Sequence, residues 1–216
     1  MSNRCERREG AKTVKQDIIL AGVGGQGILS IAYVIDNAAL KEGLSFKQAE
    51  VHGMAQRGGA VQSHMRLSNE PIFSDLIPKG EADMILSVEP LESIRYFDYL
   101  APAGIVVTSS SPFVNIPNYP DLEEVLVRIR SVPKNIIVDS AKLAQEAGFA
   151  KAQNMVMLGA ASGHLILQEE NLKAFIRKLF QPRGDKVVDI NLKAFQLGRS
   201  AASESSDAGS VPRADR

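Results

Sequence analysis

The feature that most constrains the fold is a short apolar run that ends in a cluster of glycines. Residues 17–23 read DIILAGV, which predicts a strand buried on both faces. Residues 28–42 follow with helical spacing, and Gly43 then ends the predicted helix. A buried strand, a glycine turn and a helix in this order are typical of the first unit of an α/β sheet.

The rest of the chain continues this alternation of strands and helices. Further strands are predicted at 45–51, 60–67, 84–88, 104–108 and 135–139, and further helices at 90–100, 122–130, 140–147, 154–167, 169–180 and 188–197. The order predicts a three-layer α/β/α, Rossmann-like fold with a mostly parallel sheet. Residues 60–73 break the alternation, so we expect a hairpin or an antiparallel strand that makes the sheet mixed.

The two ends of the chain differ in composition from the part between them. Residues 1–16 are charged and lack an apolar pattern, and residues 200–216 are rich in Ala, Ser, Asp and Gly without a period. We therefore expect a disordered N-terminal arm (1–16), a single domain (17–199) and a disordered C-terminal tail (200–216).

Charge and composition exclude several classes of protein. The 25 Lys and Arg balance the 25 Asp and Glu, which argues against binding nucleic acid or an acidic membrane surface. No apolar run reaches the roughly 18–20 residues that span a bilayer, and no secretory leader follows Met1, so a cytoplasmic protein is expected. The single Cys5 cannot ligate an iron–sulfur cluster, and the three histidines lack the spacing of a zinc site. We expect no metal on this chain.

The glycine turn between the first strand and the first helix satisfies the pattern G-x-G-x-x-G. Glycine permits a tight turn, and a helix N-terminus attracts an anion. The pattern leaves three interpretations open: a dinucleotide site with Glu50 on the ribose, a contact with another anion or a partner, or close packing alone. The residues concerned are Gly22, Gly24, Gly25, Gln26 and Gly27.

A second group of polar and glycine residues follows the second predicted strand. The Arg57 guanidinium could bind a carboxylate or phosphate with two hydrogen bonds. The Gln56 amide could donate to a carbonyl, and the His52 imidazole could transfer a proton. The alternative is a loop that bonds its own carbonyls or packs on another subunit. We therefore predict a substrate or interface loop, and no catalytic residue, at His52, Gln56, Arg57, Gly58 and Gly59.

Three other residues or pairs have structural interpretations. His64 is expected to face out of its strand or to satisfy a local hydrogen bond. His164 is expected to be a packing histidine on a helix. Gly159 and Gly163 predict a close approach of another helix.

Taken together, these motifs resemble a known family. GVGGQG at 22–27, EVHGMAQRGG at 50–59 and the V-x-x-H-x-R strand at 61–66 resemble the gamma-type domain of 2-oxoacid:ferredoxin oxidoreductases, in particular the beta subunits of the indolepyruvate type. SVEPLE at 87–92 and NMVMLGA at 154–160 add to the resemblance, which runs over about residues 17–180.

The resemblance implies a reaction that this chain cannot perform alone. The family decarboxylates a 2-oxoacid on thiamine diphosphate, passes electrons through iron–sulfur clusters to ferredoxin and releases an acyl-CoA. This chain lacks a thiamine diphosphate signature and cluster cysteines. It is therefore expected to be an accessory subunit, with both cofactors on a large alpha subunit, coenzyme A as cosubstrate and indolepyruvate or another arylpyruvate as substrate.

Two alternatives remain from the sequence. One is a freestanding dinucleotide-binding Rossmann-like enzyme, and the other is an interaction module that has kept the fold and lost the complex. An isolated subunit is also expected to form a homodimer through the surface that its partner normally covers.

Overall fold

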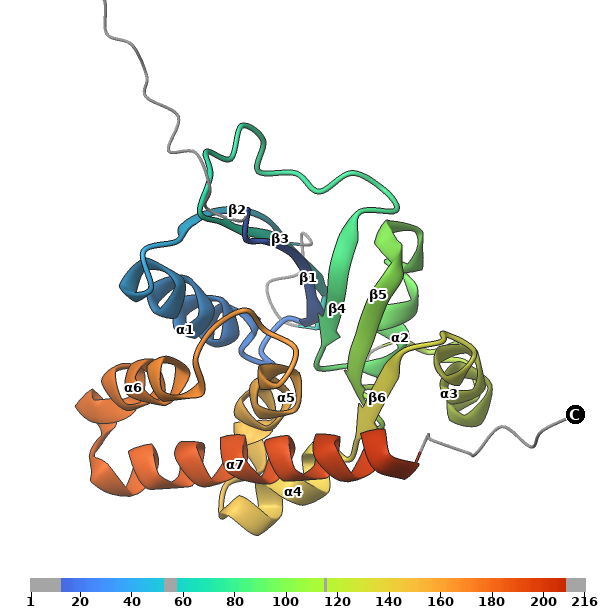
Figure 1. Ribbon diagram of the computed structural model, residues 1–216. Helices are drawn as coiled ribbons and strands as arrows, with labels where there is room; N and C mark the ends of the chain where they lie inside the picture. Colours follow the sequence, from blue (N-terminus) through green and yellow to red (C-terminus); the bar gives the residue numbers. More distant parts are fainter. Residues whose placement is uncertain (1–12, 53–57, 115, 209–216) are drawn as a thin grey trace, which may run out of the picture.

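The computed structural model describes residues 13–52, 58–114 and 116–208 (Figure 1). The strands are β1 (Lys15–Val23), β2 (Ser45–His52), β3 (Ala60–Ser68), β4 (Ala82–Ser87), β5 (Leu100–Ser109) and β6 (Asn135–Val138). The helices are α1 (Ile28–Lys41), α2 (Pro90–Ile94), α3 (Leu122–Arg130), α4 (Ser140–Ala147), α5 (Gln153–Ser162), α6 (Glu169–Phe180) and α7 (Asp185–Ala208). Short 3₁₀ helices are η1 (Phe97–Tyr99), η2 (Ala150–Ala152) and η3 (Gln181–Arg183).

The strands form one six-stranded sheet in the order β2-β3-β1-β4-β5-β6. β1, β4, β5 and β6 run parallel, whereas β3 is antiparallel to both of its neighbours, β1 and β2. The connection from β2 to β3 is too short for a crossover helix, so these strands can only form a hairpin. The predicted α/β fold with a mixed sheet is confirmed.

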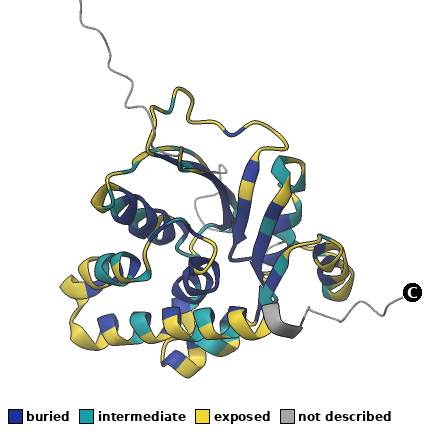
Figure 2. Cartoon of the chain, viewed as in Figure 1, coloured by how far each residue is buried: buried dark blue, intermediate teal, exposed yellow. Residues whose placement is uncertain are grey.

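Helices cover both faces of the sheet and divide the apolar core into two parts. Ile18 and Leu20 of β1 belong to the larger core, under α1, α5, α6 and α7. Ile19 belongs to the smaller core, under α2 and α3. Figure 2 shows the buried faces of the helices turned toward the strands. The central strand is therefore buried on both sides, as its apolar sequence predicted.

One predicted helix is much shorter in the structure. The prediction of a helix over 90–100 is wrong beyond Ile94, because η1 follows and β5 already begins at Leu100. Pro102 disfavours a helical conformation for the residue before it. Tyr96, Phe97 and Tyr99 pack against the smaller core instead.

The C-terminal helices also differ from their predicted limits. α5 ends at Ser162, so His164 lies exposed in the following turn and is not the packing histidine that was predicted. Gln16 stabilises this turn, because its side chain donates to the His164 carbonyl at 2.7 Å and accepts from the Ile166 amide at 3.1 Å. These two hydrogen bonds stabilise the turn that follows α5 and prevent the helix from continuing.

The predicted disorder after residue 199 is wrong for residues 200–208, because α7 continues to Ala208. Alanine favours helix, and Ala202 is buried against the larger core. The predicted disorder of residues 1–12 and 209–216 falls on positions outside the described residues. At the other end of the domain, β1 begins at Lys15, two residues before the predicted strand.

Candidate functional site

The glycine turn lies at the carboxyl end of β1. At this point the connections after β1 and after the neighbouring strand β4 lead toward opposite edges of the sheet. The connection after β1 passes over one face of the sheet through α1, and the connection after β4 passes over the other face through α2. In open α/β sheets, ligands bind in the crevice at such a switch point. The fold therefore places the turn at the position where a site is expected.

The backbone of the turn requires glycine at two positions. Gly25 has φ 103° and Gly27 has φ 80°, both in the left-handed region. The Gln26 amide donates to the Val23 carbonyl at 3.0 Å, and the Gln26 side-chain oxygen accepts from the Val23 amide at 2.8 Å. Gln26 therefore closes the turn on itself.

The turn and the second predicted loop meet in space. The Gly24 amide donates to the Gly59 carbonyl at 2.8 Å, and the Gly58 amide donates to the Gly24 carbonyl at 3.3 Å. The structure thus brings together Gly24, Gly58 and Gly59 from the two predicted groups. Gln56 and Arg57 lie outside the described residues, and so does the side chain of His52.

A buried asparagine fixes the start of α1 and was not identified as a site residue from the sequence. Asn154, at the beginning of α5, donates from Nδ2 to the Gly27 carbonyl at 3.2 Å. A Cβ at position 27 would lie 2.4 Å from that Nδ2 atom. In the sequence, Asn154 is a polar residue at the start of an apolar helical segment. This position indicates that its side chain has a hydrogen-bond partner, but it does not identify that partner.

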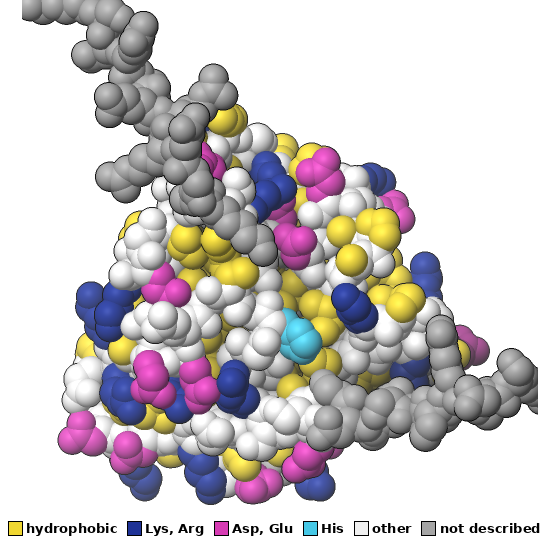
Figure 3. Space-filling model, in the orientation of Figure 1, with side chains coloured by type: hydrophobic (Ala, Val, Ile, Leu, Met, Phe, Trp, Pro, Cys, Tyr) yellow, Lys and Arg dark blue, Asp and Glu magenta, His cyan; other side chains and the backbone are white. Residues whose placement is uncertain are grey.

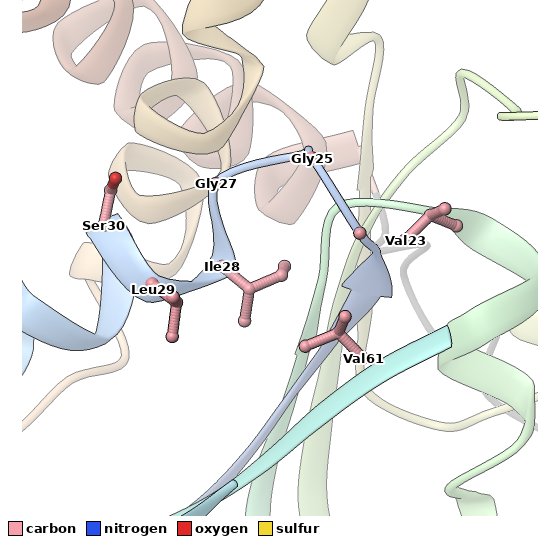
Figure 4. A pocket seen from close by; sticks show the side chains of 8 residues that line it. Val23, Gly25, Gly27, Ile28, Leu29, Ser30 and Val61 are labelled. Atoms are coloured by element: carbon pink, nitrogen blue, oxygen red, sulfur yellow. The ribbon is translucent and has the colours of Figure 1, made fainter. Parts of the chain in front are cut away.

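Three hollows surround the turn. The first, of about 360 Å³, lies between the turn, α1 and β3, and Figure 4 shows Ile28, Leu29 and Val61 on its walls. The second, of about 330 Å³, is lined by Phe113, Lys151 and Gln153. The third, of about 320 Å³, is lined by residues that include Lys151, Arg183 and the buried Asn191.

The rims of these hollows combine apolar and cationic side chains. Leu29, Phe113 and Phe149 are exposed there, one beside each hollow. Lys151 and Arg183 are also exposed and supply positive charge. Apolar side chains suit contact with another protein surface, and the cations suit an anionic group.

Glu89 positions the loop that carries Phe113. Its carboxylate is buried at the carboxyl end of β4, where it caps α2 by accepting from the Glu92 amide at 2.8 Å. It also accepts from the Phe113 amide and from the Tyr119 hydroxyl. Burial and this hydrogen bond raise the pKa of Tyr119, so the phenol stays protonated as the donor.

One of the three interpretations of the glycine turn, a dinucleotide site with Glu50 on the ribose, does not fit this fold. Glu50 pairs with Ser63 of β3, and Ser63 pairs with Leu20 of β1, so β3 separates Glu50 from the glycine turn. With neighbouring strands about 4.8 Å apart, the Glu50 main chain lies about 10 Å from β1. A dinucleotide fingerprint needs the acid on the strand beside β1.

His64 is buried on β3, where its Nδ1 accepts from the Ile77 amide at 3.1 Å, so the predicted local hydrogen bond is present. Within the described ranges, no group of three or more His, Cys, Asp or Glu side chains is arranged to hold a metal ion. No helix in that part of the chain is long and apolar enough to cross a membrane.

Comparison with known proteins identifies the family. The sequence matches the model of the family described as pyruvate ferredoxin/flavodoxin oxidoreductase over residues 17–201. The chain belongs to this family. The resemblance inferred from its motifs is therefore confirmed, and the chain is a subunit of a 2-oxoacid:ferredoxin oxidoreductase.

Individual relatives of this oxidoreductase subunit agree in length and fold. It is 40% identical over 198 residues to indolepyruvate oxidoreductase subunit IorB of Pyrococcus horikoshii, covering 87% of this chain and 96% of the relative. The gamma subunit of a keto/oxoacid ferredoxin oxidoreductase from Geobacter sulfurreducens superposes with a TM-score of 0.65 at 22% identity, covering 88% of this chain and 99% of that one.

Another solved structure contains the same fold inside a longer chain. The 2-oxoglutarate:ferredoxin oxidoreductase from Magnetococcus marinus matches with a TM-score of 0.70 at 23% identity. The match covers 93% of this chain but only 32% of that one. In that enzyme, the fold is one segment of a larger polypeptide.

Proposed function

We propose that this chain is the accessory subunit of an indolepyruvate or arylpyruvate:ferredoxin oxidoreductase in the cytoplasm. The complex decarboxylates the 2-oxoacid oxidatively, forms the acyl-CoA and passes electrons to ferredoxin. The observation that carries the proposal is the 40% identity to an indolepyruvate oxidoreductase subunit over nearly the whole length of that relative. A match over the full length supports the same position in the same kind of complex.

The redox and carbanion chemistry belongs to the larger subunit in this proposal. The sequence has one cysteine, whereas an iron–sulfur cluster takes about four ligands. The chain also lacks the Gly-Asp-Gly…Asn-Asn type of thiamine diphosphate motif. We therefore assign thiamine diphosphate and the clusters to the partner, and contact with ferredoxin to the complex as a whole.

We assign the contact of this chain with the larger subunit to the surface around the glycine turn. Exposed Leu29, Phe113 and Phe149 suit an interface with the larger subunit, and Lys151 and Arg183 suit an anion such as a coenzyme A phosphate or the substrate carboxylate. Gly58 and Gly59, which follow His52, Gln56 and Arg57 in the sequence, bond to Gly24 of this turn.

Reconstitution tests the proposed reaction. The chain and its larger subunit are co-expressed without oxygen, and reduction of a viologen dye is measured with coenzyme A and indolepyruvate, pyruvate or a branched-chain 2-oxoacid. We expect activity only from the complex, with kcat/KM at least tenfold higher for indolepyruvate. A preference for pyruvate would disprove the substrate assignment, and full activity of the isolated chain would disprove the accessory role.

The anion contact has its own test. Loss of one charge-assisted hydrogen bond of about 1.5 kcal/mol corresponds to about tenfold weaker binding. We therefore expect Lys151→Ala to raise the KM for coenzyme A or for the 2-oxoacid about tenfold in the reconstituted complex. Lys47→Ala, at an exposed position on β2, is the control and is expected to leave both constants unchanged.

A further inference from the structure

A second unusual surface lies at the opposite end of the sheet from the glycine turn. Residues 69–78, here called the arm, leave β3 after Ser68 and lead toward β4. Ser68 pairs with Lys15 at the start of β1, whereas the turn follows Val23 at its end. This length of strand corresponds to roughly 26 Å. Figure 1 shows the arm as the extended green-blue loop beyond the strands.

Arg66, on β3, fixes the path of the arm through hydrogen bonds. Its Nε and Nη2 atoms bind the buried carboxylate of Asp17 at 2.9 and 3.0 Å. Its Nη1 atom donates to the carbonyls of Ser74 and Leu76 at 3.2 and 3.1 Å. One guanidinium thus joins the start of β1 to the middle of the arm.

The end of the arm is fixed by a separate contact. The Ile77 amide donates to His64 Nδ1, and the Ile77 side chain is buried in the smaller core. The His64 ring in turn meets the Tyr99 ring edge-on, with centroids 5.3 Å apart. The arm is therefore a defined structure held at several points.

This defined structure presents its largest apolar side chains to solvent. Phe73 is 93% exposed and Leu76 is 56% exposed. Phe73 has the highest exposure of the large apolar side chains in the described residues. The Phe73 side chain is therefore almost entirely unburied within this chain. An exposed aromatic side chain on a segment held by several hydrogen bonds is typical of a residue that anchors a protein interface.

A hollow beside Phe73 is lined by charged and apolar side chains. It has a volume of about 310 Å³ and is lined by residues that include Lys15, Asp17, Arg66, Pro71 and Ile72. Two cations therefore face one carboxylate, and the Lys15 side chain remains 44% exposed. A surface that covers Phe73 would need an apolar pocket, and the exposed part of Lys15 could pair with one acidic side chain at its edge.

We propose that the arm is a docking element for the larger subunit of the complex. Phe73 inserts into an apolar pocket of that subunit, and an acidic side chain of the subunit faces Lys15. The inference rests on the proposed function, because it requires that this subunit exists as partner. It adds a contact surface at the end of the sheet away from the glycine turn.

One observation favours the larger subunit over a second copy of this chain. In the Magnetococcus enzyme the same fold is one segment of a longer polypeptide, so other domains of the enzyme are available to cover its surfaces.

The test compares Phe73→Ser with Val127→Ser in the full chain. Val127 is a suitable control because it is 56% exposed on α3, away from the arm. The affinity of each variant for the purified larger subunit is measured by titration calorimetry, and the melting temperature of each isolated chain is recorded. We expect Phe73→Ser to bind at least tenfold more weakly, Val127→Ser to bind normally, and both to melt as the unaltered chain does.

The outcomes separate the two proposals. If the unaltered chain binds and Phe73→Ser binds equally well, the role of the arm is disproved and the proposed function stands. If the unaltered chain does not bind the larger subunit, both fail. If Phe73→Ser instead converts a homodimer of the isolated chain into monomers and leaves complex formation unchanged, the arm is a contact between copies and the proposal is overturned.

Discussion

Gly159 lies so close to Phe195 that a Cβ at position 159 would stand 1.9 Å from the Phe195 carbonyl oxygen. Gly198 makes the reciprocal approach, because a Cβ there would stand 1.9 Å from the Val156 carbonyl oxygen. α5 and α7 thus cross with their backbones in contact through one glycine on each helix. The predicted packing role of Gly159 is confirmed, whereas a Cβ at Gly163 would meet nothing within 4 Å.

The first prediction follows from this crossing. Gly159→Ala must push α7 away from α5, so we expect it to lower the free energy of unfolding by about 3 kcal/mol. Gly163→Ala is the matched control, because its Cβ enters open space and its φ is −71°. Urea unfolding should show the control within about 0.5 kcal/mol of the unaltered chain. Equal effects at the two positions would contradict the close crossing.

The second prediction separates backbone strain from crowding in the glycine turn. Gly25 and Gly27 both have positive φ, but only a Cβ at position 27 meets another group, the Asn154 side chain. We expect Gly25→Ala to cost about 1 kcal/mol and Gly27→Ala about 1–3 kcal/mol more. Urea unfolding of both variants measures the difference. If the two variants are equally stable, Asn154 does not restrict the turn.

The sequence predicted the turn and the order of elements because both depend on neighbouring residues. The strand–glycine–helix pattern at 17–42 is local, and the structure reproduces it closely. The position of β3 between β1 and β2 depends on pairing between distant segments, so the sequence alone could not remove the alternative with Glu50 beside the turn. The bond from Asn154 to Gly27 joins residues 127 positions apart, and no local pattern identifies such a pair.

The third prediction concerns a buried carboxyl group on α1. Asp36 is 7% exposed, and its Oδ1 has no hydrogen-bond partner in the part of the chain that the structure describes. Burial, and secondarily the charge of Glu50, raise its pKa from 3.8 to about 7. The folded state therefore binds a proton that the unfolded state has already released at neutral pH.

The direction of the pH effect follows from that raised pKa. The contribution of Asp36 to stability is fully present below pH 3.8 and is lost as the pH rises to about 7. Between pH 5 and pH 8 this loss is about 3 kcal/mol as an order of magnitude. We expect Asp36→Asn to remove this decline, measured by urea unfolding at several pH values. Asp189→Asn, at an exposed position on α7, should retain it, and an unchanged slope in Asp36→Asn would contradict the assignment.

The fourth prediction concerns the dinucleotide alternative. Because β3 lies between Glu50 and the turn, the site lacks the acid that binds the ribose. We expect titration of the purified chain with NADH or NADPH to give no saturable change in nucleotide fluorescence at micromolar concentrations. Saturable binding of one nucleotide per chain would favour the freestanding enzyme.

The last prediction concerns the ion pair between Arg66 and Asp17. The Asp17 side chain is completely buried, and the Arg66 side chain is only 14% exposed. In Arg66→Met the carboxylate keeps Lys15 at 2.8 Å but loses both guanidinium bonds, and the Ser74 and Leu76 carbonyls lose the hydrogen bonds that Arg66 donates. We expect a loss of about 3–5 kcal/mol in the free energy of unfolding, because a buried charge is left without its main partner. The double variant Asp17→Asn with Arg66→Met should recover part of this loss, since the unpaired charge is then absent. Urea unfolding of both single variants and the double variant gives the coupling energy, and additive effects would show that the two side chains do not depend on each other.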